Sequence, residues 1–169
     1  MLVNLQDIVN QYLTFRTREG TYFNFRREGL HRFYSHEDKN KVDEESYYVN
    51  GVLHGESKSF YGSGILRRIS VYDEGRIDGV HKTYHENGQL EEICYYVNGM
   101  MHGICKTYYS NGSIHSSAHY HGDKLHGEYK IYFLGGNLMS LSNMVLGMKH
   151  GICYERGVWY VYKYDKLVE

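Results

Sequence analysis

Short runs of β-favouring residues alternate with glycine-containing turn signals along most of the chain. Residues 65–72 and 106–109 are two such runs, rich in Tyr, Ile, Val and Thr. The turn signals, Asn-Gly, Ser-Gly and His-Gly, recur about every dozen residues, which is the spacing of β-hairpins. No stretch within this region has the 3.6-residue periodicity of a helix. The pattern therefore predicts an all-β protein built as one continuous antiparallel meander of hairpins.

The two ends of the chain depart from this pattern. Residues 1–15 carry apolar side chains at i, i+3, i+4, i+7 and i+8 spacing, which predicts a short amphipathic helix that caps one sheet edge. The last segment, residues 158–169, contains a strong β run and predicts a closing strand. Trp159, Tyr160 and Tyr162 of this strand are candidate edge contacts for a second copy of the chain.

The hairpins share a period of 24 residues. The first slot of the repeating unit is aromatic in four copies, at Tyr48, Tyr72, Tyr96 and Tyr120, and is Met144 in the fifth. The eleventh slot is Lys58, Lys82, Lys106 and Lys130, and the thirteenth is Phe60, Tyr84, Tyr108 and Tyr132. The seventh and eighth slots form pairs that we expect to build turns, at His54, Gly55, His102, Gly103, His126, Gly127, His150 and Gly151. So many slots in phase indicate a repeat protein.

The period divides the chain into four parts: the helix at 1–15, a degenerate first repeat and charged linker at 16–46, the repeat array at 47–157, and the closing strand at 158–169. Two strands per unit, each about 4.8 Å wide, predict an elongated sheet on the order of 50 Å long. Such a sheet is twisted and largely one layer thick.

The motif Tyr-x-Asn-Gly-x-x-His-Gly-x-x-Lys-x-Tyr-x-x-Asn-Gly-x-Leu resembles the 24-residue variant of the MORN repeat. The resemblance covers residues 47–157 well and 22–46 faintly, with departures at Asp78, Asp123 and Tyr154. It implies an open sheet of hairpins without intrinsic catalysis. It further implies an interaction or scaffolding module, and for some members association with membranes and phosphoinositides.

The composition follows from the repeat. The chain has 19 Tyr, 19 Gly and no Pro among 169 residues. Proline cannot donate to a sheet ladder, so its absence fits a chain in which nearly every residue lies in or beside a strand. Tyrosine is abundant because it recurs at two slots of the unit, the first and the thirteenth.

Charge and cysteine content narrow the class of partner and compartment. The formal net charge of −1 provides no basic field that would attract nucleic acid, which is therefore not an expected partner. No apolar run reaches the roughly 18 residues of a membrane span, and no secretory leader is evident. Three cysteines without CxxC spacing favour a reducing compartment. We expect a soluble, intracellular (cytoplasmic) protein. An alternative location is within a larger assembly such as a virion or a cytoskeletal complex.

No catalytic motif is present, and we expect neither an enzyme nor a cofactor. The histidines of the seventh slot recur on every second strand, about 10 Å apart, which is too far for one shared metal ion. His119 and His121 lie on one strand without a neighbouring thiol or carboxylate at ligand spacing, so no metal site is expected there either. Cys94 and Cys105 are expected to be cross-strand neighbours and buried thiols rather than a disulfide.

Two functions from different classes remain. The first is a scaffold that binds another protein through the sheet edges or an aromatic face formed by Tyr72, Tyr84, Tyr96, Tyr108, Tyr120 and Tyr132. The second is a peripheral membrane module whose lysine row, Lys58, Lys82, Lys106 and Lys130, binds lipid phosphates. For the tyrosines the alternative is packing within the sheet itself, and for the lysines it is a solvated face.

Overall fold

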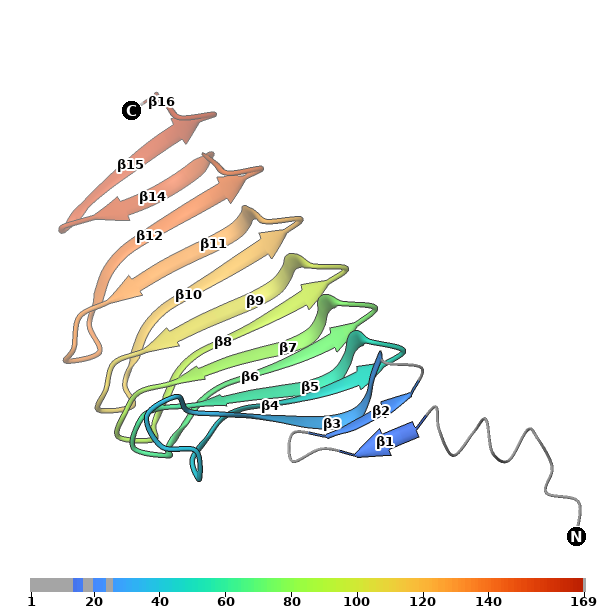
Figure 1. Ribbon diagram of the computed structural model, residues 1–169. Coiled ribbons are helices and arrows are strands. Elements are labelled where there is room, and N and C mark those ends of the chain that lie inside the picture. Colours follow the sequence, from blue (N-terminus) through green and yellow to red (C-terminus); the bar gives the residue numbers. More distant parts are fainter. Residues whose placement is uncertain (1–13, 17–19, 24–25, 169) are drawn as a thin grey trace, which may run out of the picture.

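The computed structural model describes residues 14–16, 20–23 and 26–168, and all sixteen strands of this part belong to one antiparallel sheet. The strands follow one another in chain order as a twisted, bent ladder of hairpins (Figure 1). No helix occurs among the described residues, and no segment of them could therefore span a membrane as a helix. The single-sheet meander expected from the repeat is confirmed.

The strands have the following bounds. They are β1 (Thr14–Arg16), β2 (Thr21–Phe23), β3 (Arg26–Tyr34), β4 (Val42–Val49), β5 (Val52–Phe60), β6 (Leu66–Asp73), β7 (Arg76–Tyr84), β8 (Leu90–Val97), β9 (Met100–Tyr108), β10 (Ile114–His121), β11 (Lys124–Tyr132), β12 (Leu138–Val145), β13 (Met148–Lys149), β14 (Gly151–Glu155), β15 (Val158–Lys163) and β16 (Lys166–Leu167). Strands β13 and β14 both pair with β12, on either side of His150.

The 24-residue period has a simple structural origin. One unit contains an eight-residue strand such as β6, a two-residue turn, a nine-residue strand such as β7, and a five-residue turn. In the two-residue turns both residues have positive φ, as at Asn50 (50°) and Gly51 (84°), which is the geometry that suits the twist of a hairpin. The Asn-Gly pair at 87–88 lies instead in a five-residue turn, where only Gly88 has positive φ.

Each hairpin is tied to the next at both ends. At the two-residue turns, a backbone N–H donates to the preceding repeat, as from Gly75 to the carbonyl of Leu53 (2.8 Å). At the five-residue turns, a side chain donates to the following repeat, as from the Tyr109 hydroxyl to the carbonyl of Tyr132 (2.8 Å). These contacts join each repeat to the repeats on either side of it. In such a fold each repeat contacts only its neighbours, so these links hold the array together.

The ends of the sheet differ from the sequence predictions. Most of the predicted helix, including all the apolar residues that define it, lies outside the described residues. Its last two positions, Thr14 and Phe15, belong to strand β1, so the helix does not extend over 1–15 as predicted. At the other end, β15 stops at Lys163, because Tyr164 and Asp165 both take positive φ and form a turn into β16.

The core is a line of mostly small side chains on one face of the sheet, which we name the buried column. It runs across consecutive strands, and most of its members are cross-strand partners of the next, as Ser57 is of Ser70 and His81 of Cys94. Its members are His31, Ser46, Ser57, Ser70, His81, Cys94, Cys105, Ala118, Tyr129, Ser142 and Cys153. Ser70, Cys94 and Cys153 are 0 % exposed. Larger side chains two residues along the same strands help to cover them, as Tyr48 does beside Ser46.

Four polar members of the buried column form two hydrogen-bonded pairs. The Ser46 hydroxyl lies 2.8 Å from the Ser57 hydroxyl, and the Ser70 hydroxyl lies 2.8 Å from Nδ1 of His81. Cys94 and Cys105 occupy the corresponding positions in the next repeat and form a disulfide, with Cα atoms 4.2 Å apart. The expectation of two buried thiols was therefore wrong for this pair. The pairing across the bulged β8–β9 ladder brings the two side chains together, whereas Cys153 remains a buried free thiol.

Candidate functional site

The two faces of the sheet differ in chemistry, and the predicted residues are divided between them. Side chains alternate along a strand. On β7, His81 points to the buried face, whereas Lys82 and Tyr84, one and three residues further along, point to the opposite face. We call the face opposite the buried column the open face. It carries the lysine row and the tyrosines of the thirteenth slot.

The six predicted interface tyrosines do not share one face. Tyr72, Tyr96 and Tyr120 pair with the glycines of the eighth slot and lie on the buried face, whereas Tyr84, Tyr108 and Tyr132 lie on the open face. Burial raises the pKa of Tyr96 and of Tyr120, with Glu92 adding a smaller effect in each case. The first set therefore packs within the sheet, and only the second is placed to meet a partner on the open face.

Six large apolar side chains of the open face are strongly exposed, and of these only Trp159 was predicted from the sequence, as an edge contact. They are 40–58 % exposed and come from both ends and the middle of the array: Leu30, Tyr47, Tyr95, Ile104, Ile152 and Trp159. These residues lie in slots of the unit whose amino-acid type changes from repeat to repeat, so a search for recurring residue types does not detect them. The Tyr-Tyr pairs at 47–48 and 95–96 were the one available signal, since each places a second tyrosine beside the first slot.

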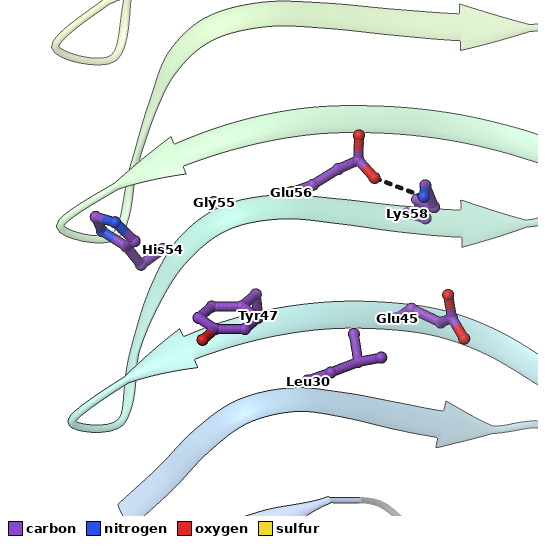
Figure 2. Close-up of a pocket in the computed structure, with 7 residues that line it drawn as sticks. All are labelled: Leu30, Glu45, Tyr47, His54, Gly55, Glu56 and Lys58. Atoms are coloured by element: carbon purple, nitrogen blue, oxygen red, sulfur yellow. Dashed lines mark ion pairs between the residues drawn. The ribbon is translucent and has the colours of Figure 1, made fainter.

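A groove of about 530 Å³ opens on this face at the N-terminal end of the array (Figure 2). Leu30 of β3 and Tyr47 of β4 lie side by side and are cross-strand partners. Glu45, His54, Gly55, Glu56 and Lys58 complete the lining. The groove thus offers an apolar floor of two large side chains next to paired charges.

The lysine row is present, but two of its four members are paired. Lys58 lies 2.5 Å from Glu56, and Lys130 lies 2.7 Å from Glu128. Hydrogen bonding to these carboxylates raises the pKa of both lysines. Within the described part of the chain, Lys82 and Lys106 have no such ion pair. The row therefore presents two unpaired ammonium groups, on β7 and β9, rather than four.

The His-Gly pairs lie within strands rather than in the turns where we expected them. Three of the pairs lie inside β5, β9 and β11, namely His54 and Gly55, His102 and Gly103, and His126 and Gly127. In the fourth pair, Gly151 is the first residue of β14 and His150 directly precedes it. Gly55 has φ +76° and accompanies a register shift between β4 and β5. A glycine is needed there because the strand bulges, and the turn itself is made by the preceding two residues.

The predicted edge residues are also divided between the faces. Trp159 packs against Tyr154 on the open face, with ring centres 4.9 Å apart. Tyr160 is the partner of Cys153 and Tyr162 of Gly151, which places both on the buried face. Trp159, Ile152 and Val161 form a second apolar patch on the open face, at the C-terminal end of the array.

One group of metal-ligand types converges on the buried face. Ligand atoms of Glu92, Cys94 and Cys105 lie within 4.8 Å of one another, and this is the only group of three that meets that criterion in the described ranges. The disulfide leaves neither sulfur as a thiolate, so only one carboxylate remains as a ligand. Burial raises the pKa of Glu92, and Glu91 adds to the shift, which further weakens it as an anionic ligand.

The geometry of the repeat agrees with a comparison to protein families. The profile described as the MORN repeat variant matches residues 53–74, 77–98, 101–121 and 125–145, which are four consecutive units. The chain belongs to the MORN repeat variant family. Each matched unit contains one hairpin joined by a five-residue turn, such as β5–β6, so the MORN unit and the hairpin coincide. A search of curated proteins gave no significant match.

The MORN repeat is a non-catalytic repeat type, and such repeats are generally associated with protein or membrane interactions. In this chain the matched units leave out β3–β4 and β14–β15. The N-terminal groove and the C-terminal patch therefore lie wholly or partly on strands outside the matched units.

Proposed function

We propose that this protein is a non-enzymatic scaffold that binds a partner protein through the open face of its sheet. The observation that carries the proposal is the row of large apolar side chains, 40–58 % exposed, along the open face of a one-layer sheet. The other face contains the buried column, in which Ser46 bonds to Ser57 and Ser70 to His81. Exposed apolar groups that are gathered on one face favour an interaction site.

The charges on the open face indicate the chemistry of the partner. Lys82 and Lys106 lie in the row between the N-terminal groove and the C-terminal patch. A partner segment that carries apolar side chains together with carboxylates would bury the first and pair the second with these two lysines. Tyrosine and tryptophan, represented here by Tyr47, Tyr95 and Trp159, are the residues that most often dominate binding energy at protein interfaces.

Membrane binding is the weaker of the two functions. A lysine row attracts anionic lipid by about 1 kcal/mol per unpaired cation near the surface. Because Glu56 and Glu128 already pair with Lys58 and Lys130, only half of the row is available for phosphates. The apolar groove beside the row favours a protein segment over a lipid headgroup.

A capture experiment with matched variants separates these functions. The full-length chain is compared with an open-face variant, Tyr47→Thr with Tyr95→Thr and Ile104→Thr, and with a lysine variant, Lys82→Gln with Lys106→Gln. Threonine keeps the β propensity of the three sites. We expect the wild type to capture a partner protein from the source cells in stoichiometric amount. The open-face variant should not capture this partner, and the lysine variant should bind it more weakly.

Two controls complete the test. Leu134→Thr with Leu167→Thr removes equally exposed leucines at turns and the last strand, and should leave capture unchanged. Flotation with vesicles that contain a phosphoinositide, at two salt concentrations, measures lipid binding directly. Capture that survives the open-face variant, or strong salt-sensitive flotation that the lysine variant abolishes, would overturn the proposal.

A further inference from the structure

Three histidine side chains meet on consecutive strands near the two-residue turns. They are His102 on β9, His121 on β10 and His126 on β11, and all three are exposed. His102 and His121 are direct cross-strand partners, with ring centres 4.7 Å apart. The rings of His121 and His126 are 6.1 Å apart. The intermediate histidine on β10 thus fills the gap that separates the two seventh-slot histidines.

This arrangement is particular to one repeat. In the preceding part of the sheet, the seventh-slot His54 faces Asp73, with Nδ1 and a carboxylate oxygen 3.1 Å apart. The position of Asp73 and His121 in the unit is occupied by valine at Val97 and Val145. A pair of facing imidazoles therefore arises only where His102 meets His121.

The three imidazoles are available as ligands. No hydrogen bond or ion pair to His102, His121 or His126 occurs within the described residues. A neutral imidazole without a hydrogen-bond partner keeps a ring nitrogen able to bind a metal ion. Exposed side chains can also rotate without disturbing a packed core.

The spacing suits ligation by a single ion. Two imidazoles that bind one ion through nitrogens at about 2.1 Å place their ring centres roughly 4.5–5.2 Å apart for bond angles of about 90–110°. The 4.7 Å separation of His102 and His121 lies in this range. His126 needs a rotation of its side chain to approach the same ion, because its ring lies farther from His121.

We propose that His102 and His121 bind a divalent late first-row transition-metal ion, with Zn²⁺ as the probe, and that His126 supplies a third ligand. Imidazole is a preferred ligand of zinc, copper and nickel, and water fills the remaining positions. The ion connects β9, β10 and β11 across two inter-strand ladders. The sequence predicted no metal ion in the seventh-slot column or at His119 and His121. That prediction did not consider that His102 faces His121 across the β9–β10 ladder.

The test is a calorimetric titration of the full-length, disulfide-intact chain with Zn²⁺ at neutral pH. We expect one ion per chain. His121→Asn and His102→Asn should each weaken the affinity at least about tenfold, because loss of one ligand removes the advantage of two linked ones. His126→Asn should weaken it by a smaller factor. Bound Zn²⁺ should also raise the melting temperature of the wild type and not that of His121→Asn.

Two matched variants complete the design. His119→Asn changes another histidine on the same strand, two residues from His121, and Cys153→Ser removes the free thiol. Both should bind Zn²⁺ like the wild type. An affinity of His121→Asn within twofold of the wild type, or loss of binding in Cys153→Ser, would overturn the proposal.

Discussion

The buried face and the open face are built from alternate residues of the same strands, yet they differ in almost every respect. On the buried face the column consists mostly of small side chains, and nine of its members are 0–8 % exposed. On the open face six large apolar side chains are 40–58 % exposed. A one-layer sheet thus buries serines and cysteines and leaves tyrosine, isoleucine and tryptophan in contact with solvent.

The difference shows that size and burial are not coupled in this fold. A small side chain is buried because its neighbours on the same face extend over it, as Tyr48 does beside Ser46. A large side chain on the open face has no second layer to cover it. Stability should therefore depend mainly on the buried face and binding on the open face, and this separation can be tested.

The largest expected effect comes from two adjacent residues of β10. Ala118 is 4 % exposed in the buried column, and Ala118→Leu should lower the free energy of unfolding by about 1–3 kcal/mol, because the larger side chain overpacks the column. Ser117 lies on the open face in the slot that holds Ile69 and Ile93 in other repeats. Ser117→Ile should change stability by less than about 0.5 kcal/mol.

Urea denaturation of the two variants measures this contrast, with the midpoint compared at constant slope. The two substitutions add similar bulk to neighbouring positions, so each is the control for the other. If both destabilise the protein to the same extent, the two faces do not differ in packing as described.

The next effect concerns the five-residue turns, which belong to neither face. Tyr109→Phe removes the hydroxyl that donates to the carbonyl of Tyr132, and should cost about 0.5–1.5 kcal/mol. Phe133 holds the same position one repeat later, but the residue that corresponds to Tyr132 there is Arg156, which lies in a turn after β14 and has positive φ. Phe133→Tyr should therefore bring no comparable gain. A gain in thermal unfolding equal to the loss in Tyr109→Phe would contradict this account.

A smaller effect should appear with pH. Burial, with a smaller contribution from Arg68, lowers the pKa of His81 from its ordinary value of 6.5. The folded protein then binds fewer protons than the unfolded chain, so stability falls as the pH drops below 6.5 and levels off below the folded pKa. His81→Gln, which does not titrate, should lose less stability between pH 7.5 and 5 than the wild type.

The control for this measurement is His119→Gln, the same substitution at a histidine on the open face. Glu92 contributes with the opposite sign, since burial raises its pKa, but it is present in all three proteins and its contribution cancels. Unfolding at a series of pH values gives the comparison. If the free energy of unfolding changes equally with pH in the wild type and in His81→Gln, the pKa of His81 does not differ between the folded and unfolded states.

The sequence predicted the fold better than the faces. Asn50-Gly51 and Asn98-Gly99 are correct hairpin turns because positive φ is a local property that Asn-Gly favours. The buried column was missed because its positions hold serine, histidine, cysteine, alanine or tyrosine, so that no single residue type recurs along it. The bulge at Gly55 also shifts the register between β4 and β5, so that counting from the turn gives the wrong cross-strand partner: Ser46 pairs with Ser57 and not with Gly55.

The candidate surface shows the same limit. Recurring letters identified Lys58 and Tyr84 correctly as periodic, but periodicity does not reveal that Glu56 pairs with Lys58. Contacts between slots depend on side chains two residues or one strand away. For that reason the unpaired state of Lys82 and the facing of His102 and His121 became evident only in the structure.

The smallest effect on stability, and a distinct effect on assembly, is expected at the C-terminal edge. β16 pairs only with Tyr162 and Lys163 of β15, so within the described residues the first part of β15, around Trp159, has no neighbouring strand on that side. An open edge of this kind can pair with a second copy of the chain. Trp159→Lys should abolish concentration-dependent dimers in sedimentation velocity while unfolding changes by less than about 0.5 kcal/mol. Tyr164→Lys, at a similarly exposed turn position, should leave the dimer intact, and equal sedimentation of all three proteins would exclude β15 as the contact.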